Sequence, residues 1–149
     1  MKELLDNQLA KNTNAKYFIF KDKPNPKSSA YDITPDIKNV RKMVRLGDDV
    51  VQGAEFFCEA VWLLPGQSPF KNEIEAHTHA FGELIGFFGF NYENVHDLGA
   101  EVELWIDGQQ HLLKETFVAF IPPGIVHGPL NICNIVRPVM YLTAGPVKK

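Results

Sequence analysis

The sequence contains the stretch His77-Thr78-His79-Ala80-Phe81-Gly82-Glu83, whose spacing is more informative than that of any other segment. His77 and His79 lie two residues apart, so on an extended strand both side chains point to the same face. Glu83 follows four residues later, which leaves room for the chain to turn and bring a carboxylate to the same place. Imidazole and carboxylate groups together suit a divalent ion such as Mn, Fe, Ni or Zn.

A third histidine stands in a comparable setting further along the chain. An apolar run ends at Pro122-Pro123-Gly124, and His127 follows three residues after the glycine. A Pro-Gly turn reverses the chain readily, because proline presets its own backbone and glycine tolerates a positive φ. The turn could therefore bring His127 back toward His77 and His79.

The two stretches together resemble the motifs of the cupin family. The first motif of that family reads G-x5-H-x-H-x3-4-E-x6-G, and the second reads G-x5-P-x-G-x2-H-x3-N. The residues at matching positions are, in order, His77, His79, Glu83, Pro122, Gly124, His127 and Asn131. The departures are at glycines: Lys71 and Thr116 stand where the motifs have glycine, and Gly89 comes one residue early. The nearest glycine before the first motif is Gly66, which indicates an insertion of about five residues near Lys71.

The resemblance covers roughly residues 55–145 and implies an all-β jelly-roll barrel, the double-stranded β-helix of cupins, with an N-terminal arm. It also implies one divalent transition metal (Mn, Fe, Ni or Zn) held by His77, His79, Glu83 and His127. Three imidazoles and one carboxylate leave about two open positions on an octahedral ion. Arms in this family often pack on a partner subunit, so the resemblance further implies a homodimer.

Composition limits the class of protein. A chain of 149 residues with 45% hydrophobic and 22% charged residues is expected to form a single globular domain. The net charge of -3, with no block of lysines, disfavours nucleic acid as a partner. No apolar run is long enough to span a membrane, and no signal peptide is evident, so we expect a cytoplasmic protein. Cys58 and Cys133 lie in apolar surroundings and are expected to be reduced core residues.

The order of turns and alternating segments predicts residues 1–50 as an arm that packs on the barrel or on a partner subunit, and residues 51–149 as the barrel. Residues 36–45 are expected to be a short helix or irregular. An inserted loop of about ten residues is expected over 91–99, as a dimer contact or a cap.

The predicted strands cover residues 17–20, 54–64, 84–90, 101–106, 109–113, 116–121 and 137–143. Within residues 54–64, one face is expected to carry Phe56, Cys58, Ala60, Trp62 and Leu64. Asp107-Gly108 is a two-residue hairpin signal.

Further polar residues are candidates for a supporting role around the metal. Tyr92, Glu103 and Asn131 could contact a substrate or hold the ligands in place, although Glu103 can do so only if its strand face points into the barrel. Glu73 and Glu75 could add acid near the metal, but a solvated loop edge is the better interpretation. The other two histidines, His96 and His111, are predicted to lie on the surface.

The sequence therefore predicts a metal-dependent enzyme that acts on a small, oxygen-rich molecule, as a dioxygenase, isomerase or lyase. The fold does not choose among these reactions, and no residue can be named as catalytic. The alternative is a non-catalytic module that binds or senses a small molecule or a metal. A metal-free structural or storage protein is disfavoured because all four ligand positions are filled.

Overall fold

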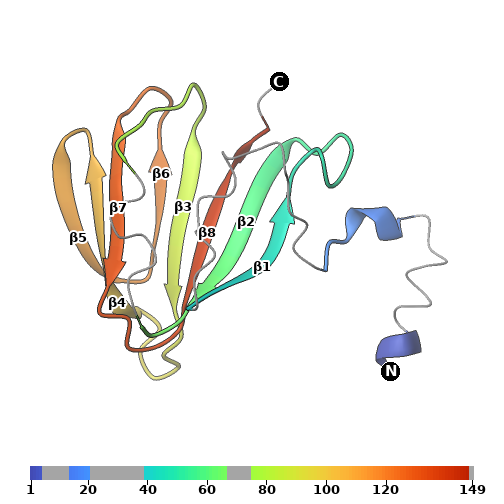
Figure 1. The fold of residues 1–149 in the computed structure, drawn as a ribbon, viewed down its shortest axis with the longest axis horizontal. Coiled ribbons are helices and arrows are strands. Elements are labelled where there is room, and N and C mark those ends of the chain that lie inside the picture. Colours follow the sequence, from blue (N-terminus) through green and yellow to red (C-terminus); the bar gives the residue numbers. More distant parts are fainter. Residues whose placement is uncertain (5–13, 21–38, 67–74, 148–149) are drawn as a thin grey trace.

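The computed structural model describes residues 1–4, 14–20, 39–66 and 75–147. Within these residues the chain forms a short 3-10 helix, η1 (Ala15–Tyr17), and eight strands arranged in two antiparallel sheets (Figure 1). The all-β jelly-roll architecture predicted from the sequence is confirmed. No helix in the described parts of the chain has the length and hydropathy that crossing a membrane requires.

The larger sheet has five strands in the order β1-β2-β8-β3-β6, and the smaller has three in the order β5-β4-β7. Strands distant in sequence lie side by side, as β8 does between β2 and β3 (Figure 1). The bounds of the larger sheet are β1 (Val40–Leu46), β2 (Phe56–Leu63), β3 (Glu83–Gly89), β6 (Phe117–Ile121) and β8 (Val139–Pro146). Those of the smaller sheet are β4 (Asp97–Ile106), β5 (Gln109–Glu115) and β7 (His127–Cys133).

The two sheets share one hydrophobic core, because alternate side chains of each strand point inward. On β4 the inward residues are Leu98, Val102 and Leu104, all of which are fully buried. They meet Phe87 of β3 and Leu63 of β2 from the opposite sheet. Full burial of one such side chain contributes about 1.5–3 kcal/mol, so the interior between the sheets accounts for much of the stability.

The hairpin predicted at Asp107-Gly108 is present. Both residues have positive φ, 49° and 76°, as a two-residue turn of type I′ requires. The turn joins β4 to β5 with Ile106 paired to Gln109, and the same register continues as far as Val102 with Leu113 before it shifts toward Asp97.

Several local predictions were wrong. Residues 36–45 were expected to be helical or irregular, but Val40–Leu46 is strand β1. Residues 17–20 form the end of η1 and an irregular stretch rather than a strand. Strand β7 was not predicted. The loop before β4 is shorter than expected, because the strand begins at Asp97. Cys133 is exposed rather than part of the core.

The inward face of β2 is the opposite of the one that the apolar pattern suggested. Phe57, Glu59, Val61 and Leu63 are buried, whereas Phe56 is exposed. The pairing of β2 with β1 and β8 sets this register and carries a glutamate into the interior.

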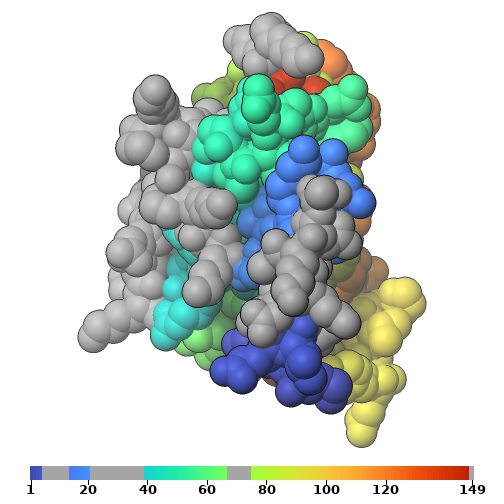
Figure 2. Space-filling view, turned by 90° about the vertical axis from the view of Figure 1, so that its right-hand side faces the viewer, coloured from blue at the N-terminus to red at the C-terminus, as the bar shows by residue number. Residues whose placement is uncertain are grey.

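Residues 14–20 lie beyond β1, at the edge of the larger sheet (Figures 1 and 2). Their aromatic side chains Tyr17, Phe18 and Phe20 are exposed to solvent. The insertion expected near Lys71 and the arm over residues 21–38 lie outside the described residues.

Candidate metal centre

His77 and His127 are placed opposite each other by a short antiparallel bridge. The amide of each donates to the carbonyl of the other at 2.9 Å. Residues directly opposite in an antiparallel pair present their side chains on the same side. The bridge therefore brings the imidazole of His77 beside that of His127 in β7, and the two ring centroids are 4.4 Å apart.

His79 lies two residues further along and shares the face of His77. Its carbonyl accepts a hydrogen bond from the amide of Gly124 at 2.8 Å, which ties this segment to the turn before β7. Its ring stacks on Phe81, with centroids 4.7 Å apart and planes within 12°. Backbone and ring contacts together fix the orientation of the imidazole.

Glu83 begins β3, and its carboxylate is buried. One oxygen, Oε2, lies 3.0 Å from Nε2 of His79 and 3.2 Å from Nε2 of His127. One ligand atom from each of His77, His79, Glu83 and His127 can be chosen so that all lie within 4.8 Å of one another. The four side chains thus converge on one point, although they come from three separate segments.

Two of the histidines have their tautomer fixed by backbone carbonyls. Nδ1 of His77 lies 2.7 Å from the carbonyl oxygen of Glu75, and Nδ1 of His127 lies 2.9 Å from that of Ile125. A carbonyl only accepts, so each Nδ1 must donate its proton to it. When the ring is neutral, Nε2 is left with a free lone pair. This is the arrangement that commonly orients metal-bound histidine.

The site also shifts the protonation of its histidines. The hydrogen bond to Glu83 is the main cause that raises the pKa of His127, with a smaller contribution from the carbonyl of Ile125. Burial is the main cause that lowers the pKa of His79, and the other two imidazoles add to it, while Glu83 opposes the shift. His127 therefore retains a proton in the metal-free site at a pH where His79 has lost its own.

Three imidazole nitrogens and one carboxylate oxygen are a donor set that divalent transition metals accept. Glu83 and His127 are buried, whereas His77 is exposed and His79 is partly exposed. The site is consequently open on the side of the two histidines in residues 77–79. A small molecule could reach the four donors from that side.

The other candidate residues lie away from these four. Tyr92 is 92% exposed in the loop after β3, beyond the end of the strand opposite to Glu83. Glu103 is paired in register with Asn131, and the inward neighbours on either side, such as Val102 and Leu104, place both on the outer face of the smaller sheet. Glu103 accepts hydrogen bonds there from Trp105 Nε1 at 2.6 Å and from a neighbouring glutamine.

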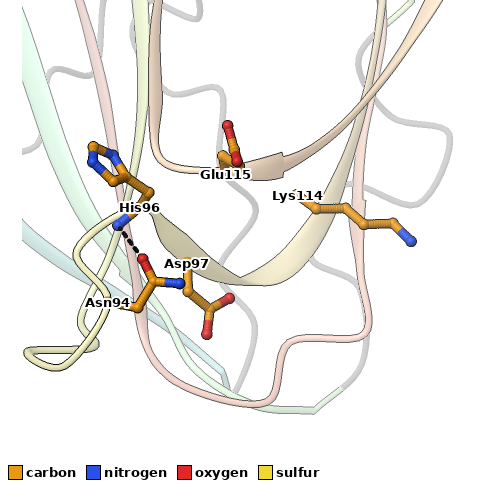
Figure 3. A pocket seen from close by; sticks show the side chains of 5 residues that line it. All are labelled: Asn94, His96, Asp97, Lys114 and Glu115. Atoms are coloured by element: carbon orange, nitrogen blue, oxygen red, sulfur yellow. Dashed lines mark hydrogen bonds between the residues drawn. The ribbon is translucent and has the colours of Figure 1, made fainter.

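His96 and His111 are exposed, in agreement with their predicted surface position. His96 lines a shallow surface hollow of about 560 Å³ together with Asn94, Asp97, Lys114 and Glu115 (Figure 3). Its ring points away from the two carboxylates in that view.

Glu75 is exposed and serves the site through its carbonyl oxygen. Glu73 lies outside the described residues.

Inspection of the sequence missed the polar side chains that face the interior near the four donors. They are Glu59 on β2 and Tyr141 and Thr143 on β8, and all three are buried. The signal for Glu59 was available, because it alternates in phase with Val61 and Leu63. It was overlooked because the opposite face of β2 is the more uniformly apolar one.

No family model matches the chain, and no curated protein matches it. It is similar to solved structures, among them an RmlC-like cupin from Shewanella frigidimarina, at 15% identity and a TM-score of 0.47, over 85% of this chain and 94% of the other. A cupin superfamily protein from Desulfitobacterium hafniense has 14% identity and a TM-score of 0.47, over 87% and 98%. A predicted oxalate decarboxylase from Thermotoga maritima has 17% identity and a TM-score of 0.48, over 82% and 97%. The first two carry the name of the family that the motifs at His77 and His127 resemble.

Proposed function

We propose that this chain binds one divalent transition metal through His77, His79, Glu83 and His127. We further propose that it is a metal-dependent enzyme for a small, oxygen-rich molecule. The observation that carries the proposal is the convergence of these four donors within 4.8 Å. The fixed tautomers of His77 and His127 support it, because both rings direct Nε2 away from the backbone carbonyl that holds Nδ1.

The chemistry that such an ion supplies is Lewis-acid polarisation of a substrate oxygen, or the binding of dioxygen beside the substrate. The four side chains contribute the positions of the donors and leave about two coordination positions free. Exposure of His77 and His79 gives a ligand a route to those positions. This favours an enzyme of the dioxygenase, isomerase or lyase type over a closed structural metal site.

A homodimer is part of the same proposal. The aromatic side chains Tyr17, Phe18 and Phe20 are exposed beside β1, and exposed aromatic groups of this kind mark interaction surfaces. Light scattering should then give the mass of two chains for the full protein. A variant that starts at residue 21 should give the mass of one chain if the arm holds the pair together.

Elemental analysis of untagged protein, purified without chelator and then reconstituted with Mn, Fe, Ni or Zn, tests the metal site. We expect one ion per chain, and loss of that ion in His77→Ala combined with His79→Ala. The matched control is His96→Ala combined with His111→Ala, which also removes two imidazoles but only from the surface. Full metal in the first variant would show that the ligand assignment is wrong.

Substrate turnover separates the enzyme from a binding module. The loaded protein should transform at least one small carbonyl or hydroxy compound in a screen followed by NMR, and the double variant at His77 and His79 should not. Binding of a compound without its conversion, across a panel that includes dioxygen, would favour the module.

A further inference from the structure

The three histidines of the site are not held in the same way. Nδ1 of His77 and Nδ1 of His127 each donate to a backbone carbonyl, at 2.7 Å and 2.9 Å. Within the part of the chain that the structure describes, no carbonyl accepts from the ring of His79, whose Nε2 faces Oε2 of Glu83 at 3.0 Å. A hydrogen bond to the second ring nitrogen is the usual means of orienting a metal-bound imidazole, so His79 requires a different support.

Phe81 supplies that support on one side of the imidazole. Its ring stacks on His79 with centroids 4.7 Å apart and planes within 12°, whereas the rings of His77 and His127 meet His79 at steeper angles. A metal-bound imidazole shares the positive charge of the ion, and the negative face of a phenyl ring attracts such a group. The stack therefore restrains the plane of the His79 ring and favours its metal-bound form.

Phe57 in turn holds the ring of Phe81. It is 5% exposed on β2, and its ring lies 6.0 Å from that of Phe81 at 80°, the edge-to-face geometry that aromatic pairs prefer. Gly145 of β8 is paired in register with Phe57 and leaves room for this ring. A Cβ atom at Gly145 would lie 2.7 Å from Cε1 of Phe57 and 3.2 Å from the carbonyl oxygen of Gly82. The larger sheet thus fixes Phe57, and Phe57 connects the sheet to the ring that stacks on His79.

We propose that Phe81 and, behind it, Phe57 are positioning residues for His79 as a metal ligand; this inference rests on the proposed metal site. The two rings do for His79 what main-chain carbonyls do for His77 and His127. His79 needs this restraint because its side chain is 28% exposed, on the open side of the site. A stack restrains the plane of an imidazole without donating or accepting a proton, so it does not choose the tautomer of His79.

Cobalt-loaded full-length protein tests the proposal, because the visible absorption of Co²⁺ responds to the geometry of its ligands. Phe81→Leu should weaken cobalt binding by about tenfold or more in competition with a chelator, and should shift the absorption bands. Phe81→Tyr keeps the stacked ring and should match the wild type in both measurements. Phe57→Leu should weaken binding by about threefold to tenfold, the size of an aromatic pair.

Combining the two substitutions shows whether Phe57 acts through Phe81. In that case Phe57→Leu should add less than about twofold to the effect of Phe81→Leu. Additive effects would overturn the role assigned to Phe57. The matched control is Phe87→Leu, which also removes a buried ring, but one that packs on Phe117 and Tyr141. It should lower stability in urea and leave the cobalt affinity and the absorption bands unchanged.

Metal content, measured on the same samples, distinguishes the two ways in which this can fail. If the wild type binds no ion, the proposed function fails and this inference fails with it. If the ion is bound but Phe81→Leu keeps the wild-type bands and an affinity within about twofold, the metal site stands and the positioning role is wrong. Should Phe57→Leu fail to fold by circular dichroism, Gly145→Ala displaces the Phe57 ring without removing it. Unchanged cobalt binding in that variant would overturn the role of Phe57.

Discussion

Gly128 of β7 lies close against the backbone of the segment that carries His77, and replacing it with alanine tests how the site is assembled. Its φ of +101° is one that residues with a side chain rarely adopt. A Cβ atom there would lie 2.7 Å from the carbonyl oxygen of Glu75 and 3.1 Å from the Cα atom of Ala76. Both are backbone atoms, so the segment before His77 would have to move. The displaced oxygen is the one that holds Nδ1 of His77.

The expected effect has two parts. The backbone conformation should cost alanine about 1–2 kcal/mol, and the contact with Glu75 a further 1–3 kcal/mol or so, in the free energy of unfolding. Loss of a supporting hydrogen bond to a metal-binding histidine commonly weakens metal affinity by about 10–100-fold. We therefore expect Gly128→Ala to fold, to be less stable in urea, and to bind metal about 10–100-fold more weakly in competition with a chelator.

Gly108→Ala is the matched control for this prediction. Gly108 also has a positive φ, +76°, but a Cβ atom there would have no other atom within 4 Å. This variant should lose about 1–2 kcal/mol of stability and keep the metal affinity of the wild type. If Gly128→Ala also kept that affinity, the bridge between His77 and His127 would not be what positions His77.

Three further predictions concern protonation, packing and thiol reactivity. The hydrogen bond to Glu83 raises the pKa of His127, and a bound ion must displace the proton that His127 holds below that pKa. Metal affinity should therefore rise about tenfold per pH unit up to the raised pKa of His127 and then level off. Competition with a chelator between about pH 6 and pH 8 measures this. The lowered pKa of His79 means that it loses its proton at a lower pH than His127 does. A flat profile would indicate that His127 is not a ligand. Phe87→Ala, which removes a fully buried ring from the core, should lower the free energy of unfolding in urea by about 3–5 kcal/mol, and a loss below about 1 kcal/mol would contradict the packing described. Cys133 is exposed, but partial desolvation and the Glu101 carboxylate raise the pKa of its thiol. At neutral pH iodoacetamide should therefore alkylate it more slowly than free cysteine, and Glu101→Gln should speed the reaction; an unchanged rate would exclude an effect of that carboxylate.

The parts of the fold that could be predicted are those whose conformation is set by residues adjacent in the sequence. Asp107-Gly108 supplies the positive φ values of its turn without help from any other residue. Residues 101–105 of β4, just before the turn, alternate between partly buried and buried positions. The four proposed ligands could be named for a related reason, since their spacing on two short stretches is itself the signal. The structure brings these four side chains together.

Strands β1 and β7 could not be predicted, because they form by pairing with other segments of the chain rather than through their own residue preferences. β1 carries Arg41, Lys42 and Arg45, which argue against a half-buried strand. Arg45 is nevertheless buried, because Asp49 accepts hydrogen bonds from its guanidinium and β1 pairs with β2. β7 contains a glycine and a proline within its first three residues, both unfavourable in a strand. Pairing with β4 and the bridge to His77 override that preference.

The same distinction explains why the proposed metal ligands could be named from the sequence whereas their surroundings could not. The proton acceptors for His77 and His127 are main-chain carbonyls, and every residue has one, so no residue type marks them. Glu59 became relevant only when the register of β2 against β8 placed it beside Thr143, one row from Glu83. Residue identity therefore indicates that a metal can bind, whereas the pairing of strands determines the charge next to it. Because a buried charge acts on the groups next to it, two chains with the same four donors can differ in the surroundings of the site through a single residue such as Glu59.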